Sequence, residues 1–268
     1  MNKEVLVKEF DKIFEIAKTM KAANRFEYME YYSLYCIEII LKILPLCKDE
    51  LEKNSWNRVM SLIKVMLKDK KIMSPLSTSE VYKCMKHSVF EIKGIASAGT
   101  CFLVDIKGND YYFMTNKHVV NNKKEFVVSN EDNTFEVKAK VVDTCKNYDL
   151  ALLKATINKP NFELVPVIFA DMKNVTPGVP VNVVSNNGGL GLSYMAGYVA
   201  NPKEDYILMN LSSQPGSSGS PIFDNYGSVI AIHVGKLAEI PFGINANVVE
   251  TYIKSFNLKT KKQVLVKY

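Results

Sequence analysis

Histidine is scarce in this chain of 268 residues, which has only three: His87, His118 and His233. None of them stands at a metal-motif spacing from a cysteine, so the sequence predicts no metal site. Chemistry that needs an imidazole must therefore draw on these three positions. We expect His87, which precedes the β-rich part of the chain, to be structural or on the surface.

Paired cysteines are also missing. The five cysteines are an odd number without close pairs, which argues against a disulfide framework and fits a reducing compartment. They are Cys36, Cys47, Cys84, Cys101 and Cys145. The first residues, Met1-Asn2-Lys3-Glu4, lack the apolar centre and cleavage site of a signal peptide. We therefore expect a cytoplasmic protein.

Long hydrophobic runs are absent. The most apolar stretch, from Tyr31 to Cys47, is interrupted by Glu38, Lys42 and Pro45. A helix that crosses a bilayer needs about 20 mostly apolar residues. This stretch is too short and too broken, so the sequence predicts no membrane contact.

The positive charge is concentrated at the end of the chain. The formal net charge is +6, but five lysines and no acid lie in the last eighteen residues, so the remainder is near neutral. A short basic tail, residues 258–268, is more typical of a solvated end than of a nucleic-acid site. The weaker alternative is a nucleic-acid binder, which would show salt-sensitive binding that disappears when residues 257–268 are deleted.

Residues 1–75 carry a helical pattern. Apolar residues recur at intervals of three and four from Val5 to Met20, and again within a third segment from about Asp49 to Lys70. Between them, Tyr31 to Leu41 is apolar on nearly all sides, so we expect this helix to be the buried centre of a small bundle that ends or kinks near Pro45.

The pattern changes from Val89 onward. Short β-rich runs are bounded by Gly, Asn, Asp and Pro, and they fall into two groups of about six, separated near residues 158–161. Such regular short strands favour antiparallel barrels over βαβ units. A short helix at residues 76–87 leads into them, and Asn247 to Phe256 is typical of a closing helix.

Small residues crowd the stretch from Asn210 to Pro221. It contains Gly216-Ser217-Ser218-Gly219-Ser220-Pro221, of the form Gly-x-Ser-Gly-x-Pro. Glycines let such a turn bend sharply, so that it can present a hydroxyl to a substrate carbonyl beside N–H donors for the developing oxyanion. Of the three serines, only Ser218 has a glycine two residues before it and another directly after it. The alternative is a Gly/Ser surface loop.

A serine nucleophile needs a base and a group that orients the base. His118 follows the strand-like Tyr111–Met114, and Asp149 opens the apolar run Asp149–Leu153. A carboxylate that leads into so apolar a strand is costly to bury unless it is paired. Asp143 and Asp105 are rivals, but neither heads such a run.

Thr-x-x-His-Val at His118, Asp-Leu-Ala-Leu-Leu at Asp149 and Gly-x-Ser-Gly-Ser-Pro at Ser218 occur in the order His, Asp, Ser. This set resembles the chymotrypsin-fold serine proteases, above all the secreted bacterial glutamyl endopeptidases and the periplasmic high-temperature-requirement proteases. The resemblance covers roughly residues 88–256. It includes Gly99-Thr100-Cys101-Phe102, where those families carry a Gly-Ser/Thr-Gly-Phe strand.

The resemblance implies two six-stranded barrels with an active site between them, His118 and Asp149 from the first and Ser218 from the second. The predicted fold class is therefore α+β and multidomain: an N-terminal all-α helical bundle, then an all-β double six-stranded antiparallel barrel with a C-terminal helix. We place the bundle at residues 1–75, a linker helix at 76–87, the protease domain at 88–257 and the basic tail at 258–268.

Two positions depart from the families. Ser217 stands where trypsin has the aspartate that pairs with a new N-terminus after zymogen cleavage, so this chain cannot use that route. Cys101 stands where the relatives have glycine, and we expect it to narrow the space beneath the histidine. Neither change removes a catalytic group.

The resemblance also implies a substrate pocket. Ser213 and His233, which is followed by Gly235, occupy places where glutamyl endopeptidases and viral cysteine proteases of this fold bind the residue before the scissile bond (P1), favouring Glu or Gln. A buried imidazole assisted by a hydroxyl can donate to a carboxylate or amide oxygen. Lys236 weakly favours Glu. The alternative is that His233 is a core-strand histidine with a satisfied partner.

The predicted mechanism needs no cofactor. His118 removes the Ser218 proton, Asp149 orients His118, and the N–H groups of Gly216 and Ser218, assisted by Ser217, hold the oxyanion. The predicted partner is a protein substrate. The alternative is a protease-fold binding protein that no longer catalyses, which turnover lost in Ser218→Ala would exclude.

An active protease in a cytosol needs restraint, so we expect residues 1–75 to recruit a partner or to self-associate. Small helical bundles fused to trypsin-like domains resemble bacterial immune effectors, by architecture alone. The alternative is a bundle that only packs against the barrels and stabilises them.

Overall fold

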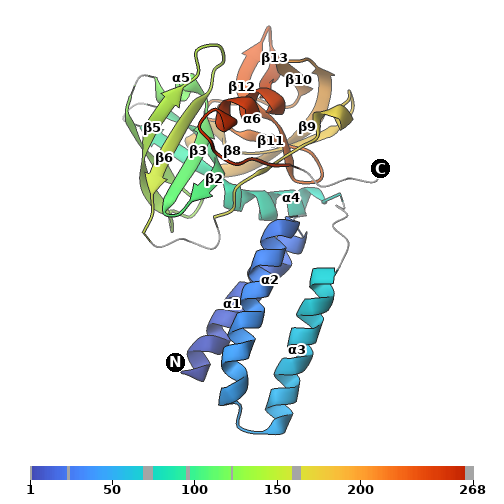
Figure 1. Ribbon diagram of the computed structural model, residues 1–268. Helices are drawn as coiled ribbons and strands as arrows, with labels where there is room; N and C mark the ends of the chain where they lie inside the picture. Colours follow the sequence, from blue (N-terminus) through green and yellow to red (C-terminus); the bar gives the residue numbers. More distant parts are fainter. Residues whose placement is uncertain are drawn as a thin grey trace. The chain divides into compact units, whose positions relative to one another are not determined.

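The computed structural model describes residues 2–22, 25–68, 75–94, 97–121, 123–158 and 164–262. The chain divides into two compact units. The first includes Met1–Ser74, and the second is Pro75–Gln263. Figure 1 labels the elements of both.

The N-terminal unit is helical, as predicted. Its elements are α1 (Lys3–Ala22), α2 (Phe26–Ile43), the 3-10 turn η1 (Leu44–Leu46) and α3 (Glu50–Lys68). The buried face of α1 follows the predicted three-and-four spacing, with Leu6, Phe10, Ile13, Ala17 and Met20. Pro45 lies in η1, just after α2 ends. The last two residues predicted for the third helix, 69 and 70, lie outside the described residues.

The prediction that the second helix is buried on nearly all sides is wrong. One face of α2 buries Cys36, Ile39, Ile40 and Ile43, but Tyr31, Leu34 and Leu41 are 59%, 50% and 55% exposed. Three large apolar side chains on one helix therefore remain in contact with water.

The first barrel is closed by six antiparallel strands in the order β1-β2-β3-β6-β5-β4. They are β1 (Val89–Gly94), β2 (Ser97–Lys107), β3 (Asp110–Thr115), β4 (Glu125–Ser129), β5 (Glu136–Thr144) and β6 (Ala151–Thr156). Alternate side chains of these strands fill one core, which includes Phe90, Phe113 and Cys101. The cysteine is fully buried there.

The second barrel has the order β11-β8-β9-β10-β13-β12, and pairing between β11 and β12 closes it. Its strands are β8 (Pro180–Asn186), β9 (Leu192–Pro202), β10 (Tyr206–Asn210), β11 (Pro221–Phe223), β12 (Ser228–Leu237) and β13 (Ile240–Asn245). The helix α6 (Ala246–Lys254) follows and packs against β12 and β13. The predicted double barrel with a C-terminal helix is confirmed (Figure 1).

Two short strands extend the second sheet; the first lies within the strand expected at residues 165–169, but the parallel pairing of both was not predicted. The strand β7 (Ile168–Phe169) pairs in parallel with β12, and β14 (Lys261–Lys262) pairs in parallel with β7. Residues 258–262 are therefore part of the protease unit and not a solvated tail: Leu258 is buried, and the Lys259 N–H donates to Asp105 Oδ2 at 2.8 Å.

The predicted linker helix also belongs to the protease unit. The helix α4 (Thr78–Met85) starts with a capping box between Ser77 and Glu80, and it buries Val81 and Met85. A Cβ at Gly227, in the turn before β12, would lie only 2.8 Å from Cε of Met85. The helix is thus packed against the second barrel.

Candidate active site

His118 and Asp149 meet as the sequence predicts. His118 lies in the short helix α5 (Lys117–Val120) after β3, and Asp149 precedes β6, which pairs with β3. The Nδ1 atom of His118 lies 2.5 Å from Oδ2 of Asp149, and the His118 backbone N–H donates to Oδ1 at 2.9 Å. The carboxylate therefore fixes both the ring and the backbone of His118, and leaves Nε2 for chemistry.

The pKa of Asp149 reflects two opposing effects. Burial acts to raise it, but the hydrogen bonds from the side chain and the backbone of His118 outweigh burial and hold the pKa below its ordinary value. Asp149 is therefore ionised near neutral pH and can stabilise a protonated His118.

Ser218 carries the accessible hydroxyl of the serine turn, which we define as residues 214–220. Ser217 and Ser220 are buried, and their hydroxyls donate to the carbonyls of Gln214 and Ser217, both at 2.6 Å. Ser218 is partly exposed and donates to the Val234 carbonyl at 3.0 Å. Of the three candidate serines, Ser218 is the one that a substrate can reach.

The backbones that carry Ser218 and His118 come together at Gly99 in β2. A Cβ on Gly99 would lie 2.9 Å from Val119, the residue after His118, and 3.3 Å from the Ser218 carbonyl oxygen. Among the described residues, no hydrogen bond joins the two side chains, because the Ser218 hydroxyl is directed to Val234. Proton transfer to His118 requires a turn of the Ser218 side chain to another staggered rotamer.

The serine turn also holds its peptide units in fixed directions. Each carbonyl of residues 215–218 accepts a hydrogen bond, and the donors are, in order, Gly188 N–H at 2.7 Å, Thr100 Oγ1 at 2.9 Å, the Ser220 hydroxyl at 2.6 Å and Thr100 N–H at 2.9 Å. In a trans peptide the N–H points away from the carbonyl of the same unit. The N–H groups of Gly216 and Ser218 are thus turned away from these anchors.

Two of the three predicted oxyanion donors are open. In the described part of the chain, neither Gly216 N–H nor Ser218 N–H has an acceptor, whereas Ser217 N–H donates to Gln214 O at 3.1 Å. Gly216 has φ +90°, and a Cβ there would lie 2.1 Å from the Asn186 carbonyl oxygen. Only glycine fits at that point of the turn.

The predicted pocket residues Ser213 and His233 are in contact, with Ser213 Oγ 2.9 Å from Nε2 of His233. His233 is completely buried in β12, and Gly235 lies beside it, at an irregularity in the pairing with β13. Burial, together with the charge of His118, lowers the pKa of His233 to about 4, and the Phe242 backbone offsets this only in part. His233 is therefore neutral at pH 7.

The catalytic candidates lie in a region that matches a known protein family. The trypsin-like peptidase domain family matches residues 99–232. This range is half of the chain and includes all three catalytic candidates. The chain belongs to this family. The expected resemblance to chymotrypsin-fold serine proteases is thereby confirmed, and its glutamyl endopeptidase part stays a prediction.

This trypsin-like peptidase has named relatives. It is 35% identical over 163 residues to the "Probable periplasmic serine endoprotease DegP-like" of Brucella suis, across 54% of this chain and 31% of that protein. The chain thus spans about a third of the length of the curated relative.

Two solved structures share the fold. The inactive form of a variant of Rv3671c from M. tuberculosis superposes with a TM-score of 0.58 at 22% identity, over 69% of this chain and 96% of that one. The HtrA-type protease AlgW with a decapeptide gives 0.58 at 18% identity, over 68% of each chain.

Two supporting residues of this trypsin-like peptidase were missed from the sequence. Asn116 is fully buried and donates from Nδ2 to the Asp149 carbonyl at 2.8 Å, and Thr100 holds two carbonyls of the serine turn. Both lie inside recognised motifs. Neither residue type performs the chemistry that a search for nucleophiles and bases looks for, so only their position beside His118 and Gly99 could have pointed to them.

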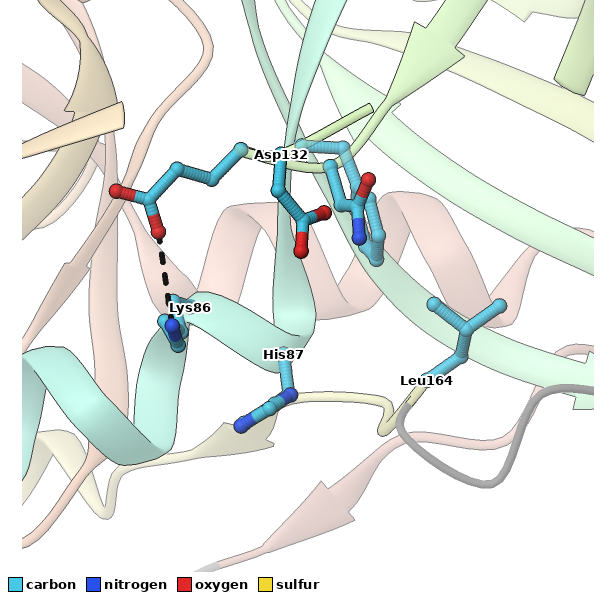
Figure 2. Close-up of a pocket in the computed structure, with 7 residues that line it drawn as sticks. Lys86, His87, Asp132 and Leu164 are labelled. Carbon is cyan, nitrogen blue, oxygen red and sulfur yellow. Dashed lines mark ion pairs between the residues drawn. The ribbon is translucent and has the colours of Figure 1, made fainter. Parts of the chain in front are cut away.

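A small cavity of about 70 Å³ lies away from these residues. It is lined by Lys86, His87, Phe90, Asn130, Glu131, Asp132 and Leu164. Nζ of Lys86 lies 3.6 Å from Oε2 of Glu131, and a dashed line at Lys86 in Figure 2 marks this ion pair. Since the lining carries charge of both signs and none of the predicted catalytic residues, we do not assign the active site to it. His87 thus lies by this cavity, outside the proposed site.

Residues 2–22, 25–68, 75–94, 97–121, 123–158 and 164–262 contain no group of three or more side chains suited to hold a metal ion. No helix within those ranges is long and apolar enough to cross a membrane. The five cysteines, which all lie within these ranges, form no disulfide bond with one another.

The buried imidazole gives a testable pH dependence of stability. The folded-state pKa of His233, about 4, lies below the ordinary value of 6.5, so the unfolded chain binds this proton more readily. The stabilisation is complete above about pH 6.5 and is lost as the pH falls toward 4. Between pH 7 and pH 5 we expect the free energy of unfolding of the wild type to fall by about 2 kcal/mol more than that of His233→Gln. Urea denaturation at both pH values measures this, and equal losses in the two proteins would contradict a buried neutral His233.

Proposed function

We propose that this chain is a serine endopeptidase that hydrolyses peptide bonds of protein substrates through His118, Asp149 and Ser218. The observation that carries the proposal is the double hydrogen bond between His118 and Asp149, beside a turn that exposes Ser218. This arrangement places a base, its orienting carboxylate and a hydroxyl in one region.

In the proposed mechanism, Ser218 rotates away from Val234, and Nε2 of His118 takes its proton as Oγ attacks the substrate carbonyl. Asp149 stabilises the imidazolium that forms. The N–H groups of Gly216 and Ser218 receive the oxyanion. His118 then gives its proton to the leaving amine and later activates water, which releases the acyl group from Ser218.

We propose Glu or Gln as the residue before the scissile bond, bound by the hydroxyl of Ser213, which His233 orients. Because His233 is neutral at pH 7, the pocket presents a polar group and no net charge. Lys236, which the sequence offered as a reason to favour Glu, lies 3.4 Å from Glu239, and its charge is shared there. We therefore expect both Glu and Gln to be accepted.

A cleavage profile tests activity and specificity together. A proteome-derived peptide library is incubated with the wild type and with Ser218→Ala, and the products are sequenced by mass spectrometry. We expect cuts after Glu or Gln that depend on Ser218. Such cuts would also exclude the alternative of a binding protein without catalysis, whereas absence of any Ser218-dependent cut would support that alternative.

Ser212 provides a matched control for the proposed role of Ser213 in the substrate pocket. Ser213→Ala is expected to lower kcat/KM for Glu and Gln substrates about tenfold to a hundredfold, because the substrate carboxylate or amide loses the hydroxyl proposed to bind it. Ser212→Ala, which removes the neighbouring exposed hydroxyl, is expected to leave kcat/KM unchanged within about twofold. Equal effects of the two substitutions would refute the pocket.

We further propose a cytoplasmic protein whose residues 1–75 recruit a partner or a second copy. The exposed Tyr31, Leu34 and Leu41 of α2 support this, since isolated large apolar side chains are common but three on one helix are more typical of a contact surface. Light scattering tests self-association: Leu34→Glu with Leu41→Glu is expected to shift any oligomer to monomer. A wild type that is monomeric at all concentrations leaves only the heterologous partner.

The role of a bacterial immune effector remains a hypothesis that rests on architecture alone. It predicts that expression in bacteria lowers phage replication and that Ser218→Ala abolishes this protection. Equal phage yields with and without the protein would remove the hypothesis, without affecting the peptidase proposal.

A further inference from the structure

Thr100 joins the first barrel to the serine turn of the second by hydrogen bonds. It is completely buried in β2. Its N–H donates to the Ser218 carbonyl at 2.9 Å, and its hydroxyl donates to the Gly216 carbonyl at 2.9 Å. The same hydroxyl accepts from the Asn186 N–H at 3.0 Å. Thr100 therefore holds the carbonyls of Gly216 and Ser218, in the peptide units that directly follow the two oxyanion donors.

The hydroxyl has a role that a backbone group cannot fill. An O–H donates one hydrogen bond and accepts another, so it can join the carbonyl of Gly216 to the N–H of the buried Asn186. The Asn186 carbonyl in turn lies where a side chain on Gly216 would be. Thr100 thus fixes the serine turn against the end of β8.

We propose that Thr100 is a positioning residue for oxyanion stabilisation. It holds the peptide units that follow Gly216 and Ser218, and so limits the rotation of these two residues, whose N–H groups lie in the preceding units. Thr115 supports it from β3, because its hydroxyl donates to the Thr100 carbonyl at 2.7 Å. A preorganised donor stabilises the transition state because it needs no reorientation during the reaction. The inference rests on the proposed peptidase function of Ser218.

The test uses Thr100→Val, which keeps the shape and removes the hydroxyl, and Thr100→Ser, which keeps the hydroxyl. Removal of one oxyanion donor in other proteases costs about a hundredfold to a thousandfold in kcat. Misalignment of a donor should cost less, so we expect Thr100→Val to lower kcat about tenfold to a hundredfold with KM unchanged within about twofold. Thr100→Ser is expected to stay within about threefold of the wild type.

Binding of a transition-state analogue separates a positioning role of Thr100 from a purely structural one. A peptide boronate forms a tetrahedral adduct with the nucleophile, so its inhibition constant should rise in Thr100→Val by the same factor by which kcat falls. The pH–rate profile should keep its midpoint, since His118 and Asp149 are untouched. If Thr100→Val does not fold, Thr100→Ala and Thr100→Ser are compared in the same assays.

Several outcomes would overturn the inference. They are a kcat of Thr100→Val within twofold of the wild type, an equal fall in Thr100→Val and Thr100→Ser, or an unchanged boronate inhibition constant alongside a reduced kcat. A wild type without Ser218-dependent turnover is a different failure, because it removes the proposed function itself.

Discussion

Replacing Ser218 with alanine is expected to lower kcat about a million-fold, to the residual rate that binding and the oxyanion donors alone provide. The physical reason is that Ser218 offers the accessible hydroxyl of the serine turn, whereas Ser217 and Ser220 are buried and bonded to backbone carbonyls. The measurement is turnover of a fluorogenic peptide with Glu or Gln before the cleaved bond. Thermal unfolding of the variant confirms that the fold is kept.

Variants of His118 show whether His118 and Ser218 act as one catalytic unit or contribute independently. His118→Ala should cost nearly as much as Ser218→Ala, and the double variant little more than either, because the two residues act as one unit. If the two losses multiplied, the residues would contribute separately and the proposed proton transfer would be wrong.

Replacing Lys262 with methionine is expected to lower the free energy of unfolding by about 3 kcal/mol. Lys262 in β14 forms an ion pair with Glu250 of α6, which is 3% exposed. Without it, the ion-pair partner of Glu250 among the described residues is Lys254, at 3.5 Å. A buried carboxylate without a close cation is costly, because burial removes its hydration. Urea denaturation at pH 7 measures the loss.

Lys236 provides a matched control, because it is 43% exposed against 45% for Lys262, yet its partner Glu239 is 90% exposed. Lys236→Met should change the free energy of unfolding by less than about 0.5 kcal/mol. Adding Glu250→Gln to Lys262→Met should restore most of the loss. A double variant no more stable than Lys262→Met would show that the loss comes from β14 packing and not from charge.

The architecture and the catalytic candidates were predictable because their signals are local. The order of His118, Asp149 and Ser218 and the change from helical to strand periodicity can each be recognised within a few residues. The pairing of His118 with Asp149 then follows from the pairing of β3 with β6, which brings the residues beyond their ends together.

The remainder depends on contacts between distant residues. Residues 258–262 are attached in part through the ion pair of Lys262 with Glu250, twelve positions earlier. From the sequence alone, the lysines of this segment were predicted to form a solvated tail. Thr100 and Asn116 bind backbone carbonyls, which every residue possesses, so the sequence does not reveal their partners. The apolar α2 was predicted to be buried because periodicity shows which faces are apolar, but not whether the chain covers them.

The most direct test of the central claim is covalent labelling with a fluorophosphonate, followed by peptide mapping. Such reagents phosphonylate a serine only where a base activates it and donors receive the developing charge. The account predicts one adduct, on Ser218, that is absent in Ser218→Ala and strongly slowed in His118→Ala. An unlabelled wild type, or an adduct on Ser217 or Ser220, would contradict it.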